Sequence, residues 1–449
     1  MSGRTHTTVL TPQDRIKTFD PYVANLIDRT AWYEASRCIM CFDAPCVTAC
    51  PTRINIPEFI FRIKTRNYRG SAKIIRESNI FGGECGYVCP VERLCESKCV
   101  RNNLGEEPVA ISLLQRFVYE MEKPKGLVKF DKAPSNKKKV AVVGAGPAGL
   151  SAAYELGRKG YEVTVCDSNA KPGGLLIYGI LPWKVAWSVA ESEIANIKEY
   201  GVRLLTKKPI ADAKGLLKDF DAVYISTGAT KSAGLGIPGE DLPGVHLAQD
   251  FLYKVACYVK GEGKAPELKG KKVVVVGGGD TAIDCAMASL RLGAEKVYVL
   301  YRRSLSEMPA VPYGRKQAKE EGAEFMLLTA PVKIIGGNKV SGVECVKMEL
   351  GSPDASGRRS VKPIKGSEFT VETDVVILAV GQKPDEAALK SFGVKVKDGL
   401  IEVDKNYATS IKGVFAGGDA VNGGDTVVEA VAEGKKAAEA IDKYLSGRK

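Results

Sequence analysis

Histidine is nearly absent from this 449-residue chain, which contains only His6 and His246. Histidine therefore cannot dominate metal ligation or acid–base catalysis. The sequence also lacks any run of eighteen apolar residues, so that no transmembrane helix is expected. The polar stretch from Met1 to Leu10 has no hydrophobic signal core, and a cytoplasmic location is the resulting expectation.

The cysteines are clustered in the sequence: eight of the twelve fall within sixty-two positions. They form two runs, Cys38-x2-Cys41-x4-Cys46-x3-Cys50-Pro51 and Cys85-x3-Cys89-Pro90-x4-Cys95-x3-Cys99. Grouped thiolates with Cys-Pro endings are typical of iron–sulfur ligation, in which the last cysteine of a run often serves the other cluster. Disulfides would require an oxidising compartment, and zinc fits two interleaved runs less well. We therefore predict two [4Fe-4S] clusters, with a non-enzymatic zinc-binding module as the remote alternative.

The formal net charge is +12, and residues 1–139 carry most of it, with 23 Lys and Arg against 15 Asp and Glu, or +8. No nucleic-acid recognition motif accompanies this charge, so nucleic acid is not an expected partner. Basic side chains instead stabilise anionic clusters, and a surplus can steer an acidic redox partner.

A dinucleotide-binding fingerprint begins after the cysteine runs. A strand is expected at 140–143, followed by Gly144-x-Gly146-x-x-Gly149, a helix at 148–159, and a second strand at 161–166 that ends at Asp167. Glycines let the backbone approach a pyrophosphate, and an acid at the second strand end binds a ribose hydroxyl. This pattern predicts a site for the ADP half of FAD.

The pattern repeats 133 residues later. A strand at 272–276 leads into Gly277-x-Gly279-x-x-Ala282 and a helix at 281–292, and the strand at 296–301 ends at Arg302 and Arg303. Arginines at this point accommodate a 2′-phosphate, so we predict NADPH at the second site. A solvated strand end is the alternative reading of these arginines.

The predicted fold is α/β, with two Rossmann-like dinucleotide-binding domains preceded by an α-helical domain that holds two [4Fe-4S] clusters. Helices are expected at 11–36, as two short segments in 56–78 around 67–70, and at 109–122, and later strands at 373–381 and 413–419 precede a helix at 426–444. The expected domains are an iron–sulfur domain at 1–125, a linker at 126–139, FAD-binding segments at 140–260 and 371–449, and an NADPH-binding domain at 261–370.

At GAGPAGL, GGGDTA and VFAGGDA the chain resembles flavoproteins with two dinucleotide-binding domains. With its cysteine runs it looks like one branch of them, over roughly residues 30–445. This branch includes the NADPH-dependent glutamate synthase small chain, the N-terminal half of dihydropyrimidine dehydrogenase with its bacterial separate-subunit version, and the large subunit of electron-bifurcating ferredoxin:NADP transhydrogenase.

The resemblance implies a ligand set for each cluster. Cys38, Cys41, Cys46 and Cys99 would hold one cluster, and Cys50, Cys89, Cys95 and Gln115 would hold the other. Gln115 matches the glutamine of the dihydropyrimidine dehydrogenase pattern, where the transhydrogenase pattern more often has glutamate. Cys85 would then be a spare thiol; the alternative is that Cys85 ligates and Gln115 lies on the helix surface.

The resemblance also implies roles around the flavin, in which Asp419 bonds the ribityl chain and the helix start at Thr426 lies at the pyrimidine edge. The FAD site would comprise Gly144, Gly146, Pro147, Ala148, Gly149, Asp167, Gly174, Gly228, Gly418, Asp419, Thr426 and Val427. The NADPH site would comprise Gly277, Gly279, Asp280, Thr281, Ala282, Arg302 and Arg303. Lys184 is a candidate flavin neighbour, although the proline of its motif is displaced by one position, and no side chain is assigned as catalytic.

These features together predict an NADPH-dependent iron–sulfur flavoprotein oxidoreductase. It would be an electron-input subunit that takes hydride from NADPH onto FAD and passes single electrons through the clusters, because flavin connects two-electron and one-electron carriers. The expected partner is a redox subunit, either an FMN or iron–sulfur enzyme or a ferredoxin. A bifurcating transhydrogenase large subunit and a stand-alone NADPH:acceptor reductase are the alternatives. The isolated Cys166, Cys257, Cys285 and Cys345 argue against a redox disulfide.

Overall fold

The computed structural model describes residues 3–353 and 358–447. The chain divides into two compact units. The first contains the N-terminal residues to Val9, Pro21–Thr230 and the residues from Lys383 onward, and the second contains Leu10–Asp20 and Lys231–Gln382.

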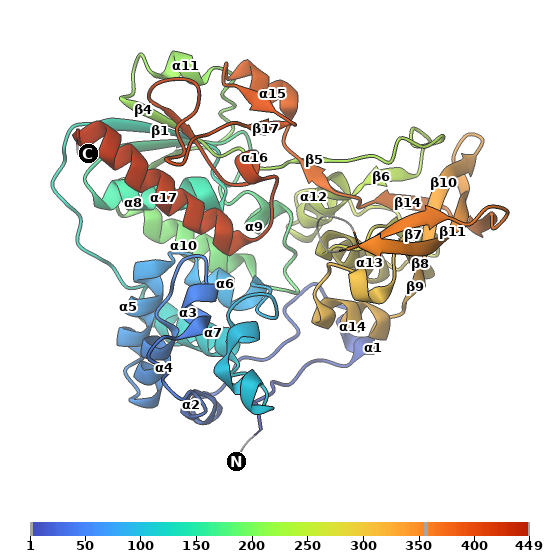
Figure 1. The fold of residues 1–449 in the computed structure, drawn as a ribbon, viewed down its shortest axis with the longest axis horizontal. Helices are drawn as coiled ribbons and strands as arrows, with labels where there is room; N and C mark the ends of the chain where they lie inside the picture. The colour runs from blue at the N-terminus through green and yellow to red at the C-terminus, as the bar shows by residue number, and fades with distance from the viewer. Residues whose placement is uncertain (1–2, 354–357, 448–449) are drawn as a thin grey trace. The chain divides into compact units, whose positions relative to one another are not determined.

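The N-terminal part of the first unit is helical, as predicted (Figure 1). Its elements are α2 (Asp28–Ser36), α3 (Pro45–Ala49), α4 (Ile56–Lys64), α5 (Tyr68–Ser78), α6 (Gly82–Val88), the 3-10 turns η1 (Glu96–Lys98) and η2 (Val100–Leu104), α7 (Ile111–Glu122) and the turn η3 (Lys123–Lys125). The expected break near 67 is confirmed, because Asn67 caps α5 by accepting a hydrogen bond from Gly70 N at 2.8 Å. Phe59, Ile63, Leu114 and Phe117 are among the buried residues of this core.

The single helix expected at 11–36 is wrong. The structure has a short α1 (Pro12–Arg15) and then α2, with residues 16–27 outside any helix. Arg15 is buried and pairs with Glu320 at 2.7 Å and Glu321 at 3.1 Å, which places this segment in the second unit. The apolar spacing of this segment therefore does not mark one continuous helix, because tertiary contacts such as those of Arg15 decide its conformation and sequence periodicity does not reveal them.

The first unit also contains a parallel sheet in the order β18-β4-β1-β2-β3. Its strands are β1 (Lys139–Val143), β2 (Glu162–Cys166), β3 (Arg203–Leu205), β4 (Ala222–Ile225) and β18 (Val414–Ala416). The accompanying elements are α8 (Pro147–Arg158), α9 (Leu175–Tyr178), α10 (Trp187–Lys198), α11 (Ala213–Leu216), α15 (Glu386–Ser391), α16 (Asp419–Asn422), α17 (Val427–Ser446), and the pair β16 (Val396–Lys397) and β17 (Leu400–Ile401).

Helix α17 packs against α8, although the two are far apart in sequence (Figure 1). Ser151 Oγ donates a hydrogen bond to Val431 O at 2.9 Å, and a side chain at Gly434 would collide with Ala148 O. The C-terminal segment thus completes the sheet and the helix layer that begin at β1.

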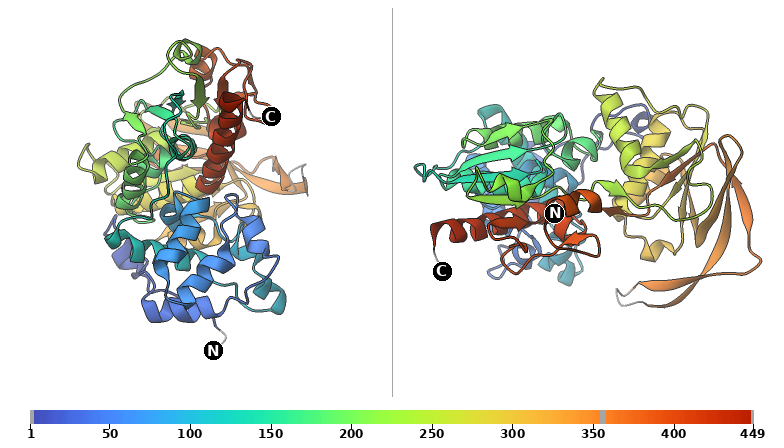
Figure 2. Two further views of the ribbon diagram at one scale, coloured as in Figure 1. Left: turned by 90° about the vertical axis from the view of Figure 1, so that its left-hand side faces the viewer. Right: turned by 90° about the horizontal axis from the view of Figure 1, so that it is seen from above.

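The second unit is built on the parallel sheet β6-β14-β7-β8-β9. Its parallel strands are β6 (Val245–Leu247), β7 (Lys272–Val276), β8 (Lys296–Tyr301), β9 (Ala323–Leu327) and β14 (Val375–Leu378). An antiparallel sheet adds β10 (Thr329–Gly336), β11 (Val340–Pro353), β12 (Arg359–Pro363) and β13 (Phe369–Glu372), and Figure 2 shows the long β10–β11 ribbon. The remaining elements are α12 (Ala248–Val259), α13 (Asp280–Arg291), η4 (Leu305–Glu307), α14 (Pro312–Glu320), β5 (Lys231–Ser232) and β15 (Gln382–Lys383).

Two domain boundaries differ from the expected ones. The chain leaves the first unit after Thr230 instead of near 260, and returns at Lys383 instead of near 371. The physical reason is strand pairing: β6 and β14 are neighbours, and β14 pairs with β7 of the second unit. A buried apolar strand is visible in sequence, but the sheet that it joins is not.

Candidate functional site

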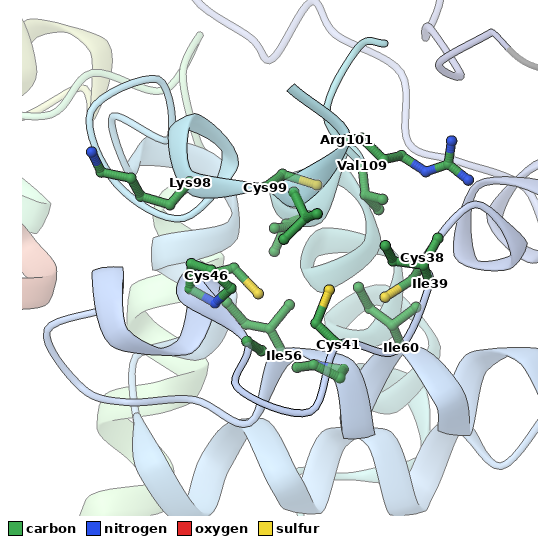
Figure 3. Close-up of a pocket in the computed structure, with 15 residues that line it drawn as sticks. Cys38, Ile39, Cys41, Cys46, Ile56, Ile60, Lys98, Cys99, Arg101 and Val109 are labelled. Carbon is green, nitrogen blue, oxygen red and sulfur yellow. The ribbon is translucent and has the colours of Figure 1, made fainter. Parts of the chain in front are cut away.

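Four cysteines from both runs line one pocket in the helical part of the first unit. Cys38, Cys41 and Cys46 come from the loop between α2 and α3 and from α3 itself, and Cys99 follows η1. In Figure 3 their sulfur atoms point toward a common space, which is bounded on one side by apolar side chains such as Ile56 and Ile60. These are the residues predicted for the first cluster. All four are partly buried, and we call them the outer cysteines.

Two of the outer cysteines, Cys46 and Cys38, are poor thiolates without a metal. Burial, together with the neighbouring Cys38 and Cys99, raises the pKa of Cys46 to about 12. Burial likewise raises the pKa of Cys38. Iron binds thiolates, so ligation would supply the positive charge that keeps these groups deprotonated. The pocket and its soft donor set therefore fit an iron–sulfur cube.

The remaining cysteines of the two runs form a second group, which we call the inner cysteines: Cys50 and Cys85, which are buried, and Cys89 and Cys95, which are partly buried. A hydrogen bond with Cys85, and then burial and the nearby Cys95 and Cys50, raise the pKa of Cys89. Burial raises the pKa of Cys95, and both Cys50 and Cys46 contribute to the shift. Because Cys46 is an outer cysteine, the two groups are neighbours.

Both candidates for the eighth ligand lie beside α6. Cys85, on α6, is 2% exposed and accepts a hydrogen bond from Asn79 Nδ2 at 3.2 Å. Gln115, on α7, is buried, and its Nε2 donates to Gly82 O at 2.6 Å. That bond fixes the amide and leaves Oε1 as its acceptor atom. The prediction that Gln115 lies inside the module, and not on an exposed helix face, agrees with its burial; its role as a ligand stays a prediction.

The inner cysteines are attached to the dinucleotide-binding part of the same unit. Arg93, between Cys89 and Cys95, pairs with Asp425 at 2.9 Å, and Asp425 immediately precedes the N-cap of α17. On α10, Glu193 accepts hydrogen bonds from Gly83 N at 2.8 Å and Glu84 N at 3.1 Å. These contacts tie the start of α6 and the second cysteine run to the FAD-binding part.

The loop after β1 has the form that a pyrophosphate requires. Gly144 has a φ of 103°, and a side chain there would meet Ser226 O, whereas a side chain at Gly149 would run into Gly144 O and Ser226 Oγ. At Gly146, by contrast, a Cβ would meet no atom within 4 Å. The loop is therefore closed on the protein side and open at Gly146, where the N-terminus of α8, with Pro147 and Ala148, begins.

Asp167 lies where the fingerprint places it, at the end of β2. Its Oδ2 accepts a hydrogen bond from Ala145 N and its Oδ1 accepts one from Asn169 N, both at 2.7 Å. The carboxylate is thus held next to the glycine loop. Gly174 is also at this loop, since a Cβ there would lie 3.0 Å from Gly146 Cα, whereas Gly228 follows β4 with open space around it.

The C-terminal segment reaches the same loop. A Cβ at Gly418 would lie 2.9 Å from Ala148 Cβ, so that the turn before α16 adjoins the start of α8. Glu433 of α17 accepts Gly418 N at 2.6 Å and thereby holds this turn. Burial and the charge of Glu433 raise the pKa of Asp419. Thr426 caps α17 by accepting Glu429 N, and Val427 begins the helix.

The second fingerprint repeats this geometry inside the second unit. Gly277 has a φ of 149° and packs against Ala379 O, whereas a Cβ at Gly279 would meet nothing within 4 Å. Three further predicted residues open α13: Asp280 Oδ1 accepts Val311 N at 3.0 Å, Thr281 Oγ1 accepts Gln382 Nε2 at 3.3 Å, and Ala282 is buried.

The structure separates the two predicted arginines. Arg302 is exposed at the end of β8, whereas Arg303 is 8% exposed and donates from Nε to Arg359 O at 2.6 Å. The side chain of Arg302 is therefore open to solvent, whereas Arg303 anchors β12 against the strand end. The sequence does not distinguish Arg302 from Arg303, but successive side chains of an extended strand end point to opposite faces.

Lys184, the candidate flavin neighbour, belongs to the motif Gly179-Ile180-Leu181-Pro182-Trp183-Lys184, in which Trp183 is 1% exposed and Lys184 is partly exposed. Sequence reasoning missed four residues that organise the site: Arg93, Glu193, Ser226 and Glu433. No local pattern could reveal them, because each acts on a segment distant in sequence, and Glu193 lies 110 positions from Gly83.

The comparisons with known proteins agree with this geometry. The family described as pyridine nucleotide-disulphide oxidoreductase matches residues 138–434, and dihydropyrimidine dehydrogenase domain II, 4Fe-4S cluster, matches residues 15–127. The chain is 36% identical to the glutamate synthase [NADPH] small chain of Azospirillum brasilense. The alignment covers 100% of this chain and 97% of that relative.

A second relative is longer than this chain. The β subunit of the NADP(+)-dependent formate dehydrogenase of Moorella thermoacetica is 40% identical over 90% of this chain, which spans 60% of that relative. Among solved structures, Mycobacterium tuberculosis FprA in complex with NADPH shares the fold with a TM-score of 0.59 at 21% identity, covering 70% of this chain and 85% of that one.

Among the described residues, no helix is both long and apolar enough to cross a bilayer. The predicted fold class, two dinucleotide-binding domains behind a 4Fe-4S domain, is confirmed, and so is the enzyme class, an NADPH-dependent iron–sulfur flavoprotein oxidoreductase. The chain belongs to the pyridine nucleotide-disulphide oxidoreductase family, in the branch with an N-terminal 4Fe-4S domain that includes the glutamate synthase small chains.

Proposed function

We propose that this chain is a cytoplasmic electron-input subunit that takes hydride from NADPH onto FAD and passes single electrons through two [4Fe-4S] clusters to a partner redox subunit. When bound, the flavin supplies the exchange between hydride and single-electron chemistry. The chain's own residues bind, orient and insulate the carriers, and no side chain has to move a proton.

The observation that carries the proposal is the pair of adjacent cysteine groups in one module. Eight cysteines in two groups supply the seven thiolates and the choice of an eighth ligand that two cubes require. The Arg93–Asp425 pair joins the inner cysteines to the start of α17, beside the turn that meets the glycine loop. This arrangement supports an order from flavin to inner cluster to outer cluster.

The acceptor is proposed to be an FMN or iron–sulfur subunit, or a ferredoxin. Two similar proteins are named as a small chain or a β subunit, which favours a partner over a stand-alone reductase. A bifurcating transhydrogenase subunit is the alternative. Gln115, at the glutamate position of that pattern, favours a dihydropyrimidine dehydrogenase-like assignment, whereas the stretch from Tyr301 to Pro309 resembles the glutamate synthase and transhydrogenase branches.

Arg302 is proposed to bind the 2′-phosphate of NADPH. Replacing Arg302 with alanine should lower kcat/KM for NADPH by about 10- to 100-fold, the worth of a charge-assisted hydrogen bond, and leave kcat/KM for NADH unchanged. Steady-state kinetics with both coenzymes measures the effect. The exposed Lys333→Ala, on β10, is the matched control. An equal loss with both coenzymes would assign Arg302 to structure instead.

The proposed electron path is tested by mixing the anaerobic protein with NADPH in a stopped-flow spectrophotometer. Flavin absorbance should bleach first and the broad cluster absorbance near 400 nm should follow, without an added acceptor. Bleaching of the flavin with no later change in the cluster bands would exclude the path through the clusters.

A further inference from the structure

Two apolar side chains next to the outer cysteines are exposed. Phe42, adjacent to Cys41, is 101% exposed, and Ile39, which lines the pocket, is 51% exposed. The loop that carries them is anchored, because Ala44 is 8% exposed and caps α3. An aromatic ring held in water by an ordered loop is typical of a binding hot spot, since burial on a partner would recover its hydrophobic free energy.

An incoming protein can approach the outer cysteines, because Cys38, Cys41, Cys46 and Cys99 are partly exposed, whereas Cys50 and Cys85 are buried. Cys89 and Cys95 are also partly exposed, but they flank Arg93, which pairs with Asp425 of the FAD-binding part. A partner that receives electrons must bring its own carrier close to the last donor. Phe42 and Ile39 lie on the surface beside these cysteines, Phe42 next to Cys41 in the chain and Ile39 in the lining of their pocket.

Basic side chains surround the same pocket. Lys98 and Arg101 line it and point away from the sulfur atoms in Figure 3. Lys98 is exposed and makes no ion pair with any residue in the described ranges, whereas Arg101 pairs with Glu106. Lys64 lies close enough to Cys38 for its charge to act on that thiol.

Only one carboxylate, Asp43, lies in the segment 38–50, and residues 1–139 carry +8. We call Ile39, Phe42, Lys64, Lys98 and Arg101 the exit patch. Its composition, an apolar centre with a basic rim, matches an acidic surface that surrounds an exposed redox cofactor.

We propose that the exit patch docks an acidic one-electron redox protein, with Phe42 as its apolar anchor and Lys98 as a steering charge. This inference rests on the proposed function and adds the surface and the charge of the partner. Each NADPH oxidised to NADP+ and a proton releases two electrons, so two molecules of a one-electron acceptor are reduced per NADPH. No bond forms between the partners.

The test uses the anaerobic holoprotein with two probes, an acidic and a basic c-type cytochrome of similar potential, at low and high salt. The acidic cytochrome should be reduced with a kcat/KM at least about fivefold higher at low salt, and salt should shrink the ratio. Phe42→Ala and Lys98→Glu should each lower kcat/KM for the acidic cytochrome at least about fivefold. The rate at which NADPH bleaches the flavin, which does not involve the exit patch, should be unchanged in both variants.

Matched controls are Ile364→Ala, at another exposed apolar side chain, and Lys412→Glu, at another exposed lysine, and both should behave as the unmodified protein. Unchanged cytochrome reduction by Phe42→Ala and Lys98→Glu, or a preference for the basic cytochrome, would overturn the exit patch while leaving the electron path intact. Failure of NADPH to bleach the flavin and cluster bands would instead overturn the proposed function, and the exit patch with it.

Discussion

Replacing Cys50 with serine should remove the inner cluster and halve the iron content, from about eight to about four atoms per chain. Cys50 is 8% exposed, and its Sγ lies 3.3 Å from Thr52 Oγ1. A serine oxygen is a harder and shorter donor than a thiolate, and iron cubes prefer soft sulfur. Iron and acid-labile sulfide analysis of anaerobically purified protein measures the result. Cys257→Ser, at a cysteine outside both groups, is the control and should retain all iron.

The same assay decides the eighth ligand. If Gln115 ligates, Gln115→Ala should lose the inner cluster and Cys85→Ala should keep it. Gln115→Glu should keep the cluster but lower its reduction potential, because a carboxylate adds a negative charge where the amide has none. Loss of the cluster in Cys85→Ala with retention in Gln115→Ala would assign Cys85 instead and leave Gln115 as a packing residue bonded to Gly82.

Replacing either of two glycines of the first fingerprint with alanine should change the stability of the FAD-free protein at one position and leave it unchanged at the other. Gly149→Ala places a methyl group against Gly144 O and 2.5 Å from Ser226 Oγ, so it should destabilise the unit even without FAD, by about 1–3 kcal/mol or more. Gly146→Ala meets no protein atom within 4 Å and has an ordinary φ of −78°, so the FAD-free protein should unfold as the unmodified chain does.

In the presence of FAD both variants should be impaired, because Gly146→Ala then also shows a defect. The methyl group of Gly146→Ala would occupy the open space where the pyrophosphate is proposed to lie, and FAD affinity should fall at least about tenfold. Thermal unfolding with and without added FAD, together with FAD titration, separates the two effects. Wild-type FAD affinity in Gly146→Ala would contradict this placement of the pyrophosphate.

Local patterns in the sequence were sufficient for the elements and the family. The strands and helices around Gly144 and Gly277 appear where the glycine spacing put them, because each fingerprint is a contiguous strand–turn–helix whose geometry depends on neighbours in sequence. The cysteine runs likewise predicted the 4Fe-4S domain, since ligand type and spacing are local properties.

Long-range choices could not be predicted in the same way. The segment around Arg15 has helical spacing, but its helix ends at Arg15, whose buried side chain pairs with Glu320 and Glu321. Strand β14 belongs to the second unit because it pairs with β7. Arg303 is buried and donates a hydrogen bond from Nε to Arg359 O. Each outcome depends on a partner that is remote in the chain, so local propensity carries no information about it.

The central claim is that two iron–sulfur cubes and one flavin share the first unit. The most direct measurement is the ratio of iron, acid-labile sulfide and FAD in anaerobically purified protein. The account predicts about eight iron and eight sulfide per FAD, all reducible by NADPH. About four iron and four sulfide per FAD would contradict the second cluster, and zinc without sulfide would contradict the electron path as a whole.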